Sequence, residues 1–327
     1  MTNRVLITGA AGQDGTYLSQ LLLGKGYEVW GVPGPYPGDF FERADKSGGR
    51  LHAIDANLRD MDSLLTAVEV SAPDEVYNFA AQSSVADSFE SAIATTEVNA
   101  VGVLRILEAL RQVKPDARFF QAATAEMFGN SAEYPQSETT PLHPRSPYAA
   151  AKTYAFHIVD SYRDSYGMHA SNGILFNHES PLRGVQFVTR KITSAAASIK
   201  LGLQSEVRLG NLDAQRDWGY AGDYVEAMWL MLQQDAPDDY VVASGHVHTV
   251  RDFCEAAFAH VGLDYRDFVV VDPEFFRPVD VTVLYGDPSK AKRVLGWEPR
   301  VSFEQLVAMM VDADLKSLQA GASDQRA

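Results

Sequence analysis

The stretch that decides the fold is Thr8-Gly9-Ala10-Ala11-Gly12-Gln13-Asp14-Gly15. It follows the apolar run 4–8 and leads into the amphipathic segment 15–23, so the pattern predicts a strand, a tight turn and a helix. Glycines at G-x-x-G-x-x-G spacing let the backbone turn closely and direct its N–H groups at a pyrophosphate on the helix N-terminus. We interpret residues 9–15 as a dinucleotide-phosphate turn; the alternative is a strand-to-helix turn without a ligand.

Strand and helix patterns alternate around this turn through the first half of the chain. The apolar strand runs lie at 4–8, 27–32, 50–55, 74–80, 117–123 and 169–176, and the helical patterns lie at 15–23, 64–70, 99–113 and 148–166. This alternation predicts an α/β fold, a doubly wound parallel sheet of the Rossmann type. Residues 217–234 and 240–243 can return to the sheet as one more helix and strand.

The alternation of strand and helix patterns breaks after residue 176, where prolines and charged residues separate shorter predicted helices. This change predicts a smaller C-terminal lobe built for a ligand. The predicted parts are a dinucleotide-binding domain at 1–176 plus about 215–244, a substrate lobe at 177–214 and 245–315, and a flexible polar tail at 316–327. Residues 31–49 are rich in Gly and Pro, so we expect a long loop there.

Composition excludes several classes of protein. The chain has 327 residues with a formal net charge of −15, and this acidic balance argues against a nucleic-acid partner. One cysteine excludes an internal disulfide and the cysteine-rich metal sites, and we expect no metal. No apolar run is long enough to span a bilayer, and the start of the chain reads as a strand and not as a signal peptide. We expect a soluble, cytoplasmic protein that does not bind membranes.

A tyrosine and a lysine four residues apart, Tyr148 and Lys152, begin the helix predicted at 148–166. Residues at this spacing share one helical face, so the ammonium can lie close to the phenol. A nearby cation favours phenolate, which predicts that the pKa of Tyr148 is lowered toward a range useful for proton abstraction. Taken alone, the pair is also compatible with chance on an exposed helix.

Two polar residues, Thr124 and Glu126, follow the strand predicted at 117–123. Parallel α/β sheets place their ligands at this end of the strands. Thr124 is a candidate for hydrogen bonding to a substrate hydroxyl, and Glu126 is a candidate general base and acid. The alternatives are a strand-end cap for Thr124 and a helix-start carboxylate for Glu126.

The glycine turn, the Thr-x-Glu pair and the Tyr-x-x-x-Lys pair together resemble the extended short-chain dehydrogenases that modify nucleotide sugars. Further segments narrow the resemblance to the GDP-mannose 4,6-dehydratase family and extend it to about residue 314: 73–78, 138–148, 173–181, 187–192, 216–219 and 276–278. The resemblance implies conversion of GDP-mannose to GDP-4-keto-6-deoxy-mannose and water through an internal hydride transfer. The alternatives are a nucleotide-sugar 4-epimerase or a keto-sugar reductase on the same scaffold, and a non-enzymatic nucleotide-binding protein. Glu126 favours the dehydratase, because epimerases and reductases need no carboxylate at that position.

The resemblance also implies a role for individual residues. The catalytic residues would be Thr124, Glu126, Tyr148 and Lys152. The cofactor would be NADP, with NAD not excluded, tightly bound and recycled, and held by Gly9, Gly12, Gln13, Asp14, Gly15, Asn57, Leu58, Ala80, Ala81, Gln82, Tyr148, Lys152, His178 and Arg183. The nucleotide sugar would be held by Ser83, Ser84, Asn177, Val188, Lys191, Gly210, Arg216, Arg277 and Asp280. For any single cation the alternative is a surface ion pair, and for His178 it is a satisfied core histidine.

The chain departs from the family's pattern after the second predicted strand. Members of the family carry two arginines there, which hold the 2′-phosphate of NADP and contact a neighbouring subunit, whereas this chain has Pro33 and Gly34. Arg43 or Lys46 could replace them only if the segment folds back. Without that replacement, the sequence predicts weaker discrimination of NADP from NAD than in the relatives.

The same departure bears on assembly. We expect a homodimer or homotetramer, with the dimer favoured because the family's subunit-joining arginines are missing. The dimer would be built from the helices predicted at 99–113 and 148–166, as in related enzymes. Two further departures are Asn57, where the family has an aspartate, and Asp280, which is one methylene shorter than the expected acid.

Overall fold

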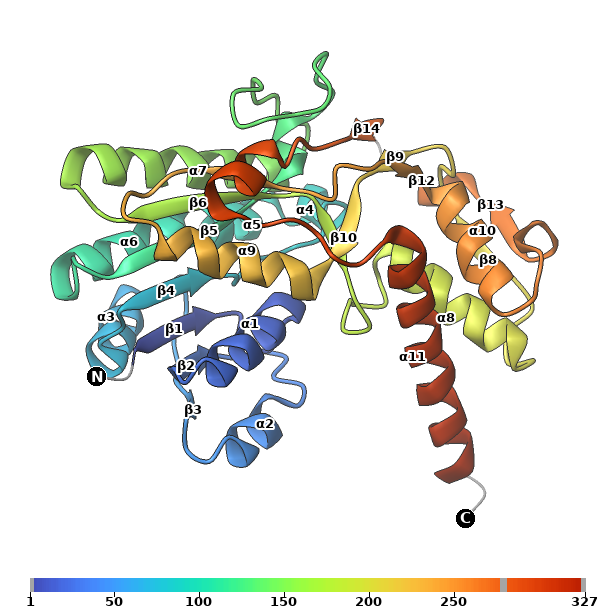
Figure 1. Ribbon diagram of the computed structural model, residues 1–327, viewed down its shortest axis with the longest axis horizontal. Helices are drawn as coiled ribbons and strands as arrows, with labels where there is room; N and C mark the ends of the chain where they lie inside the picture. Colours follow the sequence, from blue (N-terminus) through green and yellow to red (C-terminus); the bar gives the residue numbers. More distant parts are fainter. Residues whose placement is uncertain (1–2, 277–280, 325–327) are drawn as a thin grey trace.

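The computed structural model describes residues 3–276 and 281–324, and a seven-stranded parallel sheet lies at its centre (Figure 1). The strand order is β11-β6-β5-β4-β1-β2-β3, and every neighbouring pair is parallel. The strands are β1 (Arg4–Thr8), β2 (Glu28–Val32), β3 (Leu51–Ala53), β4 (Glu75–Asn78), β5 (Arg118–Thr124), β6 (Ala170–Leu175) and β11 (Tyr240–Val242). The order reverses between β1 and β4, and this confirms the predicted doubly wound sheet.

Helices cover both faces of the sheet, because successive strand side chains point to opposite sides. Val5 and Ile7 pack in one cluster with α1 (Gln13–Gly24) and α9 (Ala221–Gln233). Leu6 packs in a second cluster on the other face. The helices of that face are α3 (Met61–Ser71), α6 (Gly102–Val113) and α7 (Pro147–Tyr166). Burial on both faces explains why the strands read as continuous apolar runs.

Short helical segments connect the strand ends to the longer helices. They are α4 (Asp87–Glu90), α5 (Ala92–Thr96), the π-helix η1 (Glu97–Val101), and the 3₁₀ helix η2 (Ala125–Phe128). The α5 helix runs through η1 into α6, so the long helix predicted at 99–113 begins as a π-helix. The η2 segment directly follows β5 and carries Glu126.

A second body lies beside the sheet, with α8 (Val188–Lys200), α10 (Val250–His260) and α11 (Phe303–Asp324) packed around a third apolar cluster (Figure 1). Three small sheets complete the described part of the fold, and one of them lies within the second body. They are β7 (Asn177–Glu179) with β10 (Trp218–Tyr220), β9 (Gln215–Arg216) between β12 (His248–Thr249) and β14 (Val283–Leu284), and β8 (Val207–Leu209) with β13 (Val269–Val271). The remaining short segments are η3 (Tyr265–Asp267), η4 (Pro273–Phe275) and η5 (Ala291–Leu295).

Two segments differ from the sequence-based expectation. The predicted loop at 31–49 contains the helix α2 (Phe40–Lys46), because Phe40 is fully buried and anchors a turn of helix on the sheet edge. The segment predicted as a flexible tail from residue 316 is helical to Asp324, as the end of α11. That helix is anchored by buried residues such as Met310 and Val311, and its last turns continue from them.

No helix among residues 3–276 and 281–324 is long and apolar enough to cross a membrane.

Candidate active site

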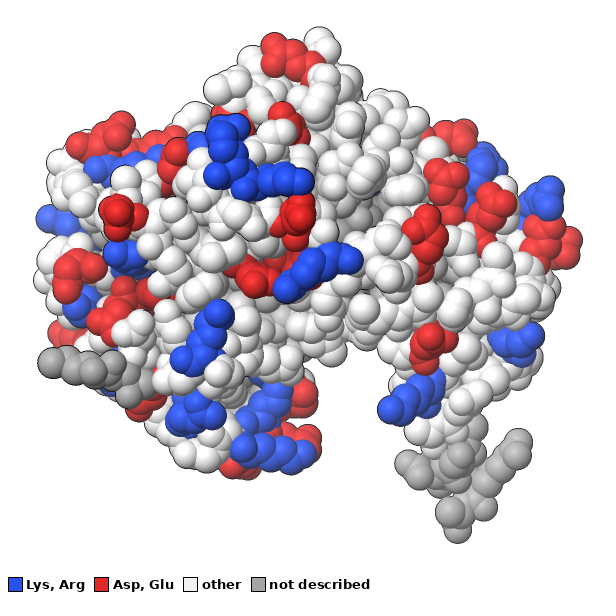
Figure 2. Space-filling model, in the orientation of Figure 1, with Lys and Arg blue, Asp and Glu red and all other residues white. Residues whose placement is uncertain are grey.

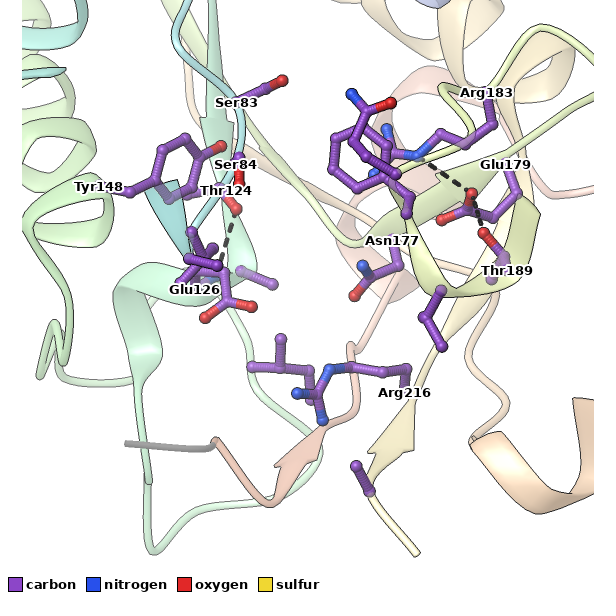
Figure 3. A pocket seen from close by; sticks show the side chains of 18 of the residues that line it. Ser83, Ser84, Thr124, Glu126, Tyr148, Asn177, Glu179, Arg183, Thr189 and Arg216 are labelled. Atoms are coloured by element: carbon purple, nitrogen blue, oxygen red, sulfur yellow. Dashed lines mark hydrogen bonds and ion pairs between the residues drawn. The ribbon is translucent and has the colours of Figure 1, made fainter. Parts of the chain in front are cut away.

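A cavity of about 760 Å³ lies at the carboxyl ends of the central strands, facing the second body. Most of the predicted site residues line it: Asp14, Ala81, Ser83, Ser84, Thr124, Glu126, Tyr148, Lys152, Asn177, His178, Arg183, Val188, Lys191, Gly210 and Arg216. Figure 3 shows Tyr148, Thr124 and Glu126 on one wall, and Asn177 and Arg216 across the cavity from them. The sheet topology brings these distant segments together because parallel strands end on one edge.

The start of α7 fixes the positions of Tyr148 and Lys152. Ser146 caps the helix by accepting a hydrogen bond from the Ala149 N–H at 3.1 Å, and Pro147 occupies the first helical turn. Lys152 is buried, and its Nζ donates to the Ala122 carbonyl at 2.8 Å. The same Nζ lies 5.9 Å from the centroid of the Tyr148 ring.

The pKa values of this pair differ from the sequence-based expectation. Burial raises the pKa of Tyr148 to about 12, against the hydrogen bond from Thr124, which favours phenolate. Burial also lowers the pKa of Lys152 to about 8. The predicted lowering of the Tyr148 pKa is therefore wrong for this structure. The physical reason is that desolvation of the phenolate dominates, while the Lys152 ammonium donates to a carbonyl.

The end of β5 presents Thr124 and Glu126 to the cavity. Thr124 Oγ1 accepts a hydrogen bond from the Glu126 N–H at 3.3 Å, which turns the chain into η2. Ala125, Met127 and Phe128 are buried and anchor η2 to the core. Glu126 remains on the open side of that segment and lines the cavity (Figure 3). Thr124 lies between the phenol of Tyr148 and the carboxylate of Glu126 (Figure 3).

The opposite wall contains an acid that sequence reasoning missed, Glu179 on β7. It is buried, and its Oε2 accepts a hydrogen bond from Thr189 Oγ1 at 2.6 Å (Figure 3). The Nε of Arg183 lies 3.1 Å from the same oxygen, an ion pair without hydrogen-bond geometry. The Arg183 guanidinium also stacks on Phe187 at 3.7 Å. Glu179 thus holds Arg183 at the cavity; the signal available in the sequence was its place in the 173–181 segment.

Two further cations stand on this wall. Lys191 Nζ lies 3.7 Å from the ring of Phe275, an aromatic lining residue that sequence reasoning also missed. Burial lowers the pKa of Lys191, with Asp272 acting in the opposite direction. Arg216 is buried, and its Nη1 donates to the Gln215 carbonyl at 2.8 Å.

The glycine turn is built for close approach. Gly9 has φ of +69°, and a Cβ on it would lie 2.9 Å from the Ala80 nitrogen. A Cβ on Gly15 would lie 2.4 Å from the Gly9 carbonyl oxygen. The Oε1 of Gln82 is buried without a hydrogen-bond partner, so an acceptor is ready for a ligand donor. A tight turn at a helix N-terminus with a free buried acceptor nearby fits a nicotinamide dinucleotide.

Replacing Gly15 with Ala is expected to lower the free energy of unfolding by about 1–3 kcal/mol, because the new methyl group overlaps backbone atoms. Gly12→Ala is the matched control, since its Cβ would meet only the Gly9 oxygen at 3.3 Å. Thermal unfolding of both variants checks this difference. Equal stabilities would contradict the close approach at Gly15.

A carboxylate–imidazole pair ties the turn to β7. His178 Nε2 lies 3.0 Å from both carboxylate oxygens of Asp14, and its Nδ1 lies 2.8 Å from the Phe176 carbonyl oxygen. Acceptors at both ring nitrogens favour the imidazolium form. Burial alone would lower the pKa of His178, but the Asp14 charge raises it above its usual value. Burial would raise the pKa of Asp14, but the His178 charge lowers it.

The pair is expected to make stability depend on pH. The stabilisation that His178 contributes is fully present below its unfolded pKa of about 6.5. It is lost as pH rises through the raised pKa of His178 in the folded state. The Asp14 contribution is present above about 3.9 and is lost as pH falls through the lowered value. His178→Asn should therefore cost most stability between these limits, by about 1–3 kcal/mol. Thermal midpoints measured against pH check this, with the exposed His143→Asn as control; a pH-independent cost would contradict it.

Some predicted cofactor residues lie outside the cavity. Gly9, Gly12, Gln13 and Gly15 form the turn beside it, and Gln13 Nε2 donates to the His178 carbonyl at 3.0 Å. Ala80 and Gln82 follow β4.

Asn57 and Leu58 lie after β3, away from the cavity. The Asn57 side chain accepts the Arg59 N–H in a local turn, and Leu58 is a core residue against Gly102. Arg277 and Asp280 lie outside the described residues. Within the described ranges, no group of three or more His, Cys, Asp or Glu side chains is placed to hold a metal ion.

The chain is similar to known proteins over nearly its whole length. The family model described as GDP-mannose 4,6 dehydratase matches residues 6–310. GDP-mannose 4,6 dehydratase 2 of Arabidopsis thaliana is 54% identical over 325 residues, covering 95% of this chain and 86% of the relative. GDP-mannose 4,6-dehydratase of Sinorhizobium fredii is 48% identical over 347 residues, covering 98% and 99%. The solved structure of Thermus thermophilus UDP-glucose 4-epimerase in complex with NAD has a TM-score of 0.84 at 29% identity, covering 95% of this chain and 98% of that chain.

Proposed function

The chain belongs to the GDP-mannose 4,6-dehydratase family, and we propose that it converts GDP-mannose to GDP-4-keto-6-deoxy-mannose and water. The observation that carries the proposal is the wall on which Thr124, Glu126 and Tyr148 line one cavity, with Lys152 beneath them. The carboxylate at position 126 separates this constellation from one that only oxidises and reduces a hydroxyl. An enzyme that only oxidises and reduces a hydroxyl needs no acid–base group for a neighbouring carbon.

Each residue has one step in the proposed reaction. A bound nicotinamide cofactor supplies an acceptor for the C4 hydride and later a hydride donor for C6. Tyr148 takes the proton of the hexose 4-hydroxyl, while Thr124 orients that hydroxyl and Lys152 supplies positive charge. The resulting 4-ketone makes the C5 hydrogen acidic. Glu126 removes the C5 proton and then protonates the departing 6-hydroxyl, which leaves as water. When hydride returns to C6, C5 takes up one proton, and the proton that Tyr148 removed from the 4-hydroxyl balances this step.

The opposite wall suits the nucleotide. Arg216 and Asn177 face the catalytic wall, and we assign them to the diphosphate, where charge-assisted hydrogen bonds are strong. Lys191 and Val188 lie on α8 and are assigned to the base. Ser83 and Ser84, on the catalytic side, are assigned to the hexose or a phosphate. The second body is thus proposed as the nucleotide-sugar lobe.

We propose NADP as the resident cofactor. The solved epimerase with the same fold is a complex with NAD, which supports a nicotinamide dinucleotide at the turn. His178 and Arg183 line the cavity near the turn and are assigned to this cofactor. Because the hydride returns to the sugar, the cofactor should remain bound through turnover.

We propose a homodimer in the cytoplasm, formed through α6 and α7. Both helices cover one face of the sheet, and α7 leaves Tyr154 and Tyr166 exposed at 43% and 56%. Light scattering of the purified protein tests the dimer, and a tetramer would contradict it.

The activity is tested by incubating the purified protein with a panel of nucleotide sugars and reading the alkaline absorbance of the 4-keto product. We expect product from GDP-mannose and from no UDP- or dTDP-hexose. An epimerised hexose without loss of water would favour the 4-epimerase, and consumption of added reduced cofactor with a keto sugar would favour the reductase. Binding without any conversion would favour a non-enzymatic nucleotide-binding protein.

A further inference from the structure

The helix α2 places a guanidinium on the glycine turn. Arg43 Nη2 lies 3.1 Å from Thr16 Oγ1 and 3.4 Å from the Ala10 carbonyl oxygen. Its Nη1 lies 3.0 Å from Ser19 Oγ. Segment 31–49 therefore folds back onto the phosphate turn, which is the condition under which this cation could replace the missing arginines.

The side chain is held in this position from several sides. Its guanidinium lies 5.5 Å from the ring of the fully buried Phe40. That ring packs against Gly31, where a Cβ would lie 2.6 Å from it, so no larger residue fits there. Arg43 Nε donates to Asp39 Oδ1 at 2.9 Å. The Arg43 side chain is only 15% exposed, whereas that of Asp39 is 62% exposed.

Lys46 does not share this environment. It pairs with Glu42 on the same exposed helix surface, at 2.5 Å, and its side chain is 74% exposed. Of the two cations in this helix, only Arg43 therefore reaches the turn.

The turn and the end of β2 are adjacent. The Ala10 N–H donates to the Val32 carbonyl at 3.0 Å. The Arg43 guanidinium, which contacts the Ala10 carbonyl, therefore lies close to the last residue of β2. In doubly wound dinucleotide-binding folds this corner meets the ribose 2′-oxygen, where an acid selects NAD and a nearby arginine accepts the 2′-phosphate of NADP. Here the corner continues as Pro33 and Gly34, which carry no charge.

The wider surface does not single out this corner as basic. Figure 2 shows Lys and Arg side chains interspersed with Asp and Glu side chains around α2, so Arg43 is distinguished by its contacts with the turn and not by a basic patch. The four contacts of Arg43 use its Nε–H, one Nη1 hydrogen and both Nη2 hydrogens, so one Nη1 hydrogen is left for a ligand.

From this placement we propose that Arg43 is the residue that selects NADP over NAD by contacting the adenosine 2′-phosphate. The inference rests on the proposed function, because it assumes a nicotinamide dinucleotide on the turn. Asp39 acts in the opposite sense, since its carboxylate neutralises part of the Arg43 charge. A purely structural Arg43, which only ties α2 to α1, would stabilise the fold without distinguishing two cofactors that differ by one phosphate.

The test measures cofactor preference and not turnover. Purified protein is equilibrated with an equimolar mixture of NADP and NAD, freed of unbound cofactor and denatured, and the released cofactors are quantified by mass spectrometry. Arg43→Gln is expected to lower the NADP:NAD ratio by about 10–100-fold, the size of one charge-assisted contact. Asp39→Asn is expected to raise the ratio. Lys46→Gln is the matched control on the same helix and should leave it unchanged.

Further outcomes separate the possibilities. An Arg43→Gln ratio equal to that of the wild type, with a lowered thermal midpoint, overturns the inference and leaves a structural arginine. Should Arg43→Gln fail to fold, Asp39→Asn still decides, because an unchanged NADP:NAD ratio in that folded variant would also overturn the inference. If the wild type forms the keto sugar but its NADP:NAD ratio is unchanged in Arg43→Gln, this inference alone is refuted. If the wild type forms no keto sugar but Arg43→Gln lowers the NADP:NAD ratio, the proposed function alone is refuted.

Discussion

Replacing Glu126 with Gln is expected to reduce turnover of GDP-mannose by about 10²–10⁴-fold, the size of one general acid–base group. The amide keeps the shape of the side chain but cannot take a proton from C5. Glu126 lies on the open side of η2, whose other residues are buried, so the substitution should leave the fold and the binding of substrate nearly unchanged.

The variant should stop at a definite point in the reaction. In the proposed mechanism, oxidation at C4 depends on Tyr148 and not on Glu126, so the absorbance of reduced nicotinamide should build up when GDP-mannose is added. Exchange of the C5 hydrogen with deuterium from solvent should be lost at the same time. The exposed Glu133→Gln is the matched control and should behave as the wild type. Near wild-type turnover in Glu126→Gln would remove this carboxylate from the mechanism and favour the epimerase.

The sequence predicted the sheet well because the central strands are buried on both faces. Runs such as 4–8 and 118–124 have no alternation to confuse with a helix, and the glycines of residues 9–15 mark the first crossover. The α2 helix was missed because the Gly and Pro residues before it are strong turn signals. What forms α2 is a tertiary contact, the burial of Phe40 beside Gly31, which no local pattern contains.

The site residues likewise divide into those that the sheet topology places and those whose role depends on tertiary contacts. Residues on strand ends and helix starts, such as Thr124 and Tyr148, could be assigned to the site because topology alone brings them to one edge. The pKa of Tyr148 could not be predicted, because helical spacing brings Lys152 near but does not say that its Nζ bonds the Ala122 carbonyl. The role of Glu179 could not be assigned from its place in segment 173–181, because that role arises from tertiary contacts with Thr189 on α8 and with Arg183 in the loop after β7.

Replacing Tyr148 with Phe is expected to abolish the first oxidation, with a loss of at least about 10²–10⁴-fold in product formation. In the proposed mechanism the phenol takes the 4-hydroxyl proton, and Thr124 lies beside it in the cavity. Unlike Glu126→Gln, this variant should show no build-up of reduced nicotinamide. Tyr154→Phe, 43% exposed on the same helix, is the matched control. Normal keto-sugar formation by Tyr148→Phe would remove the tyrosine from the mechanism.

The pKa values of the pair give this role a pH signature. With a pKa of about 12 for Tyr148 and about 8 for Lys152, the phenol is protonated near neutral pH. The reactive arrangement is phenolate beside ammonium. It has one proton fewer than the state at neutral pH. The phenol beside the neutral amine has the same number of protons as this reactive arrangement. The fraction of the reactive arrangement therefore rises tenfold per pH unit until the pair has lost one proton, near pH 8, and then levels, because the division between the two arrangements does not depend on pH. We expect kcat/KM to follow this curve in the wild type. A profile that is already level at about pH 6 would contradict this expectation. It would mean that bound ligands lower the pKa of Tyr148 below 7, in opposition to the burial that raises it.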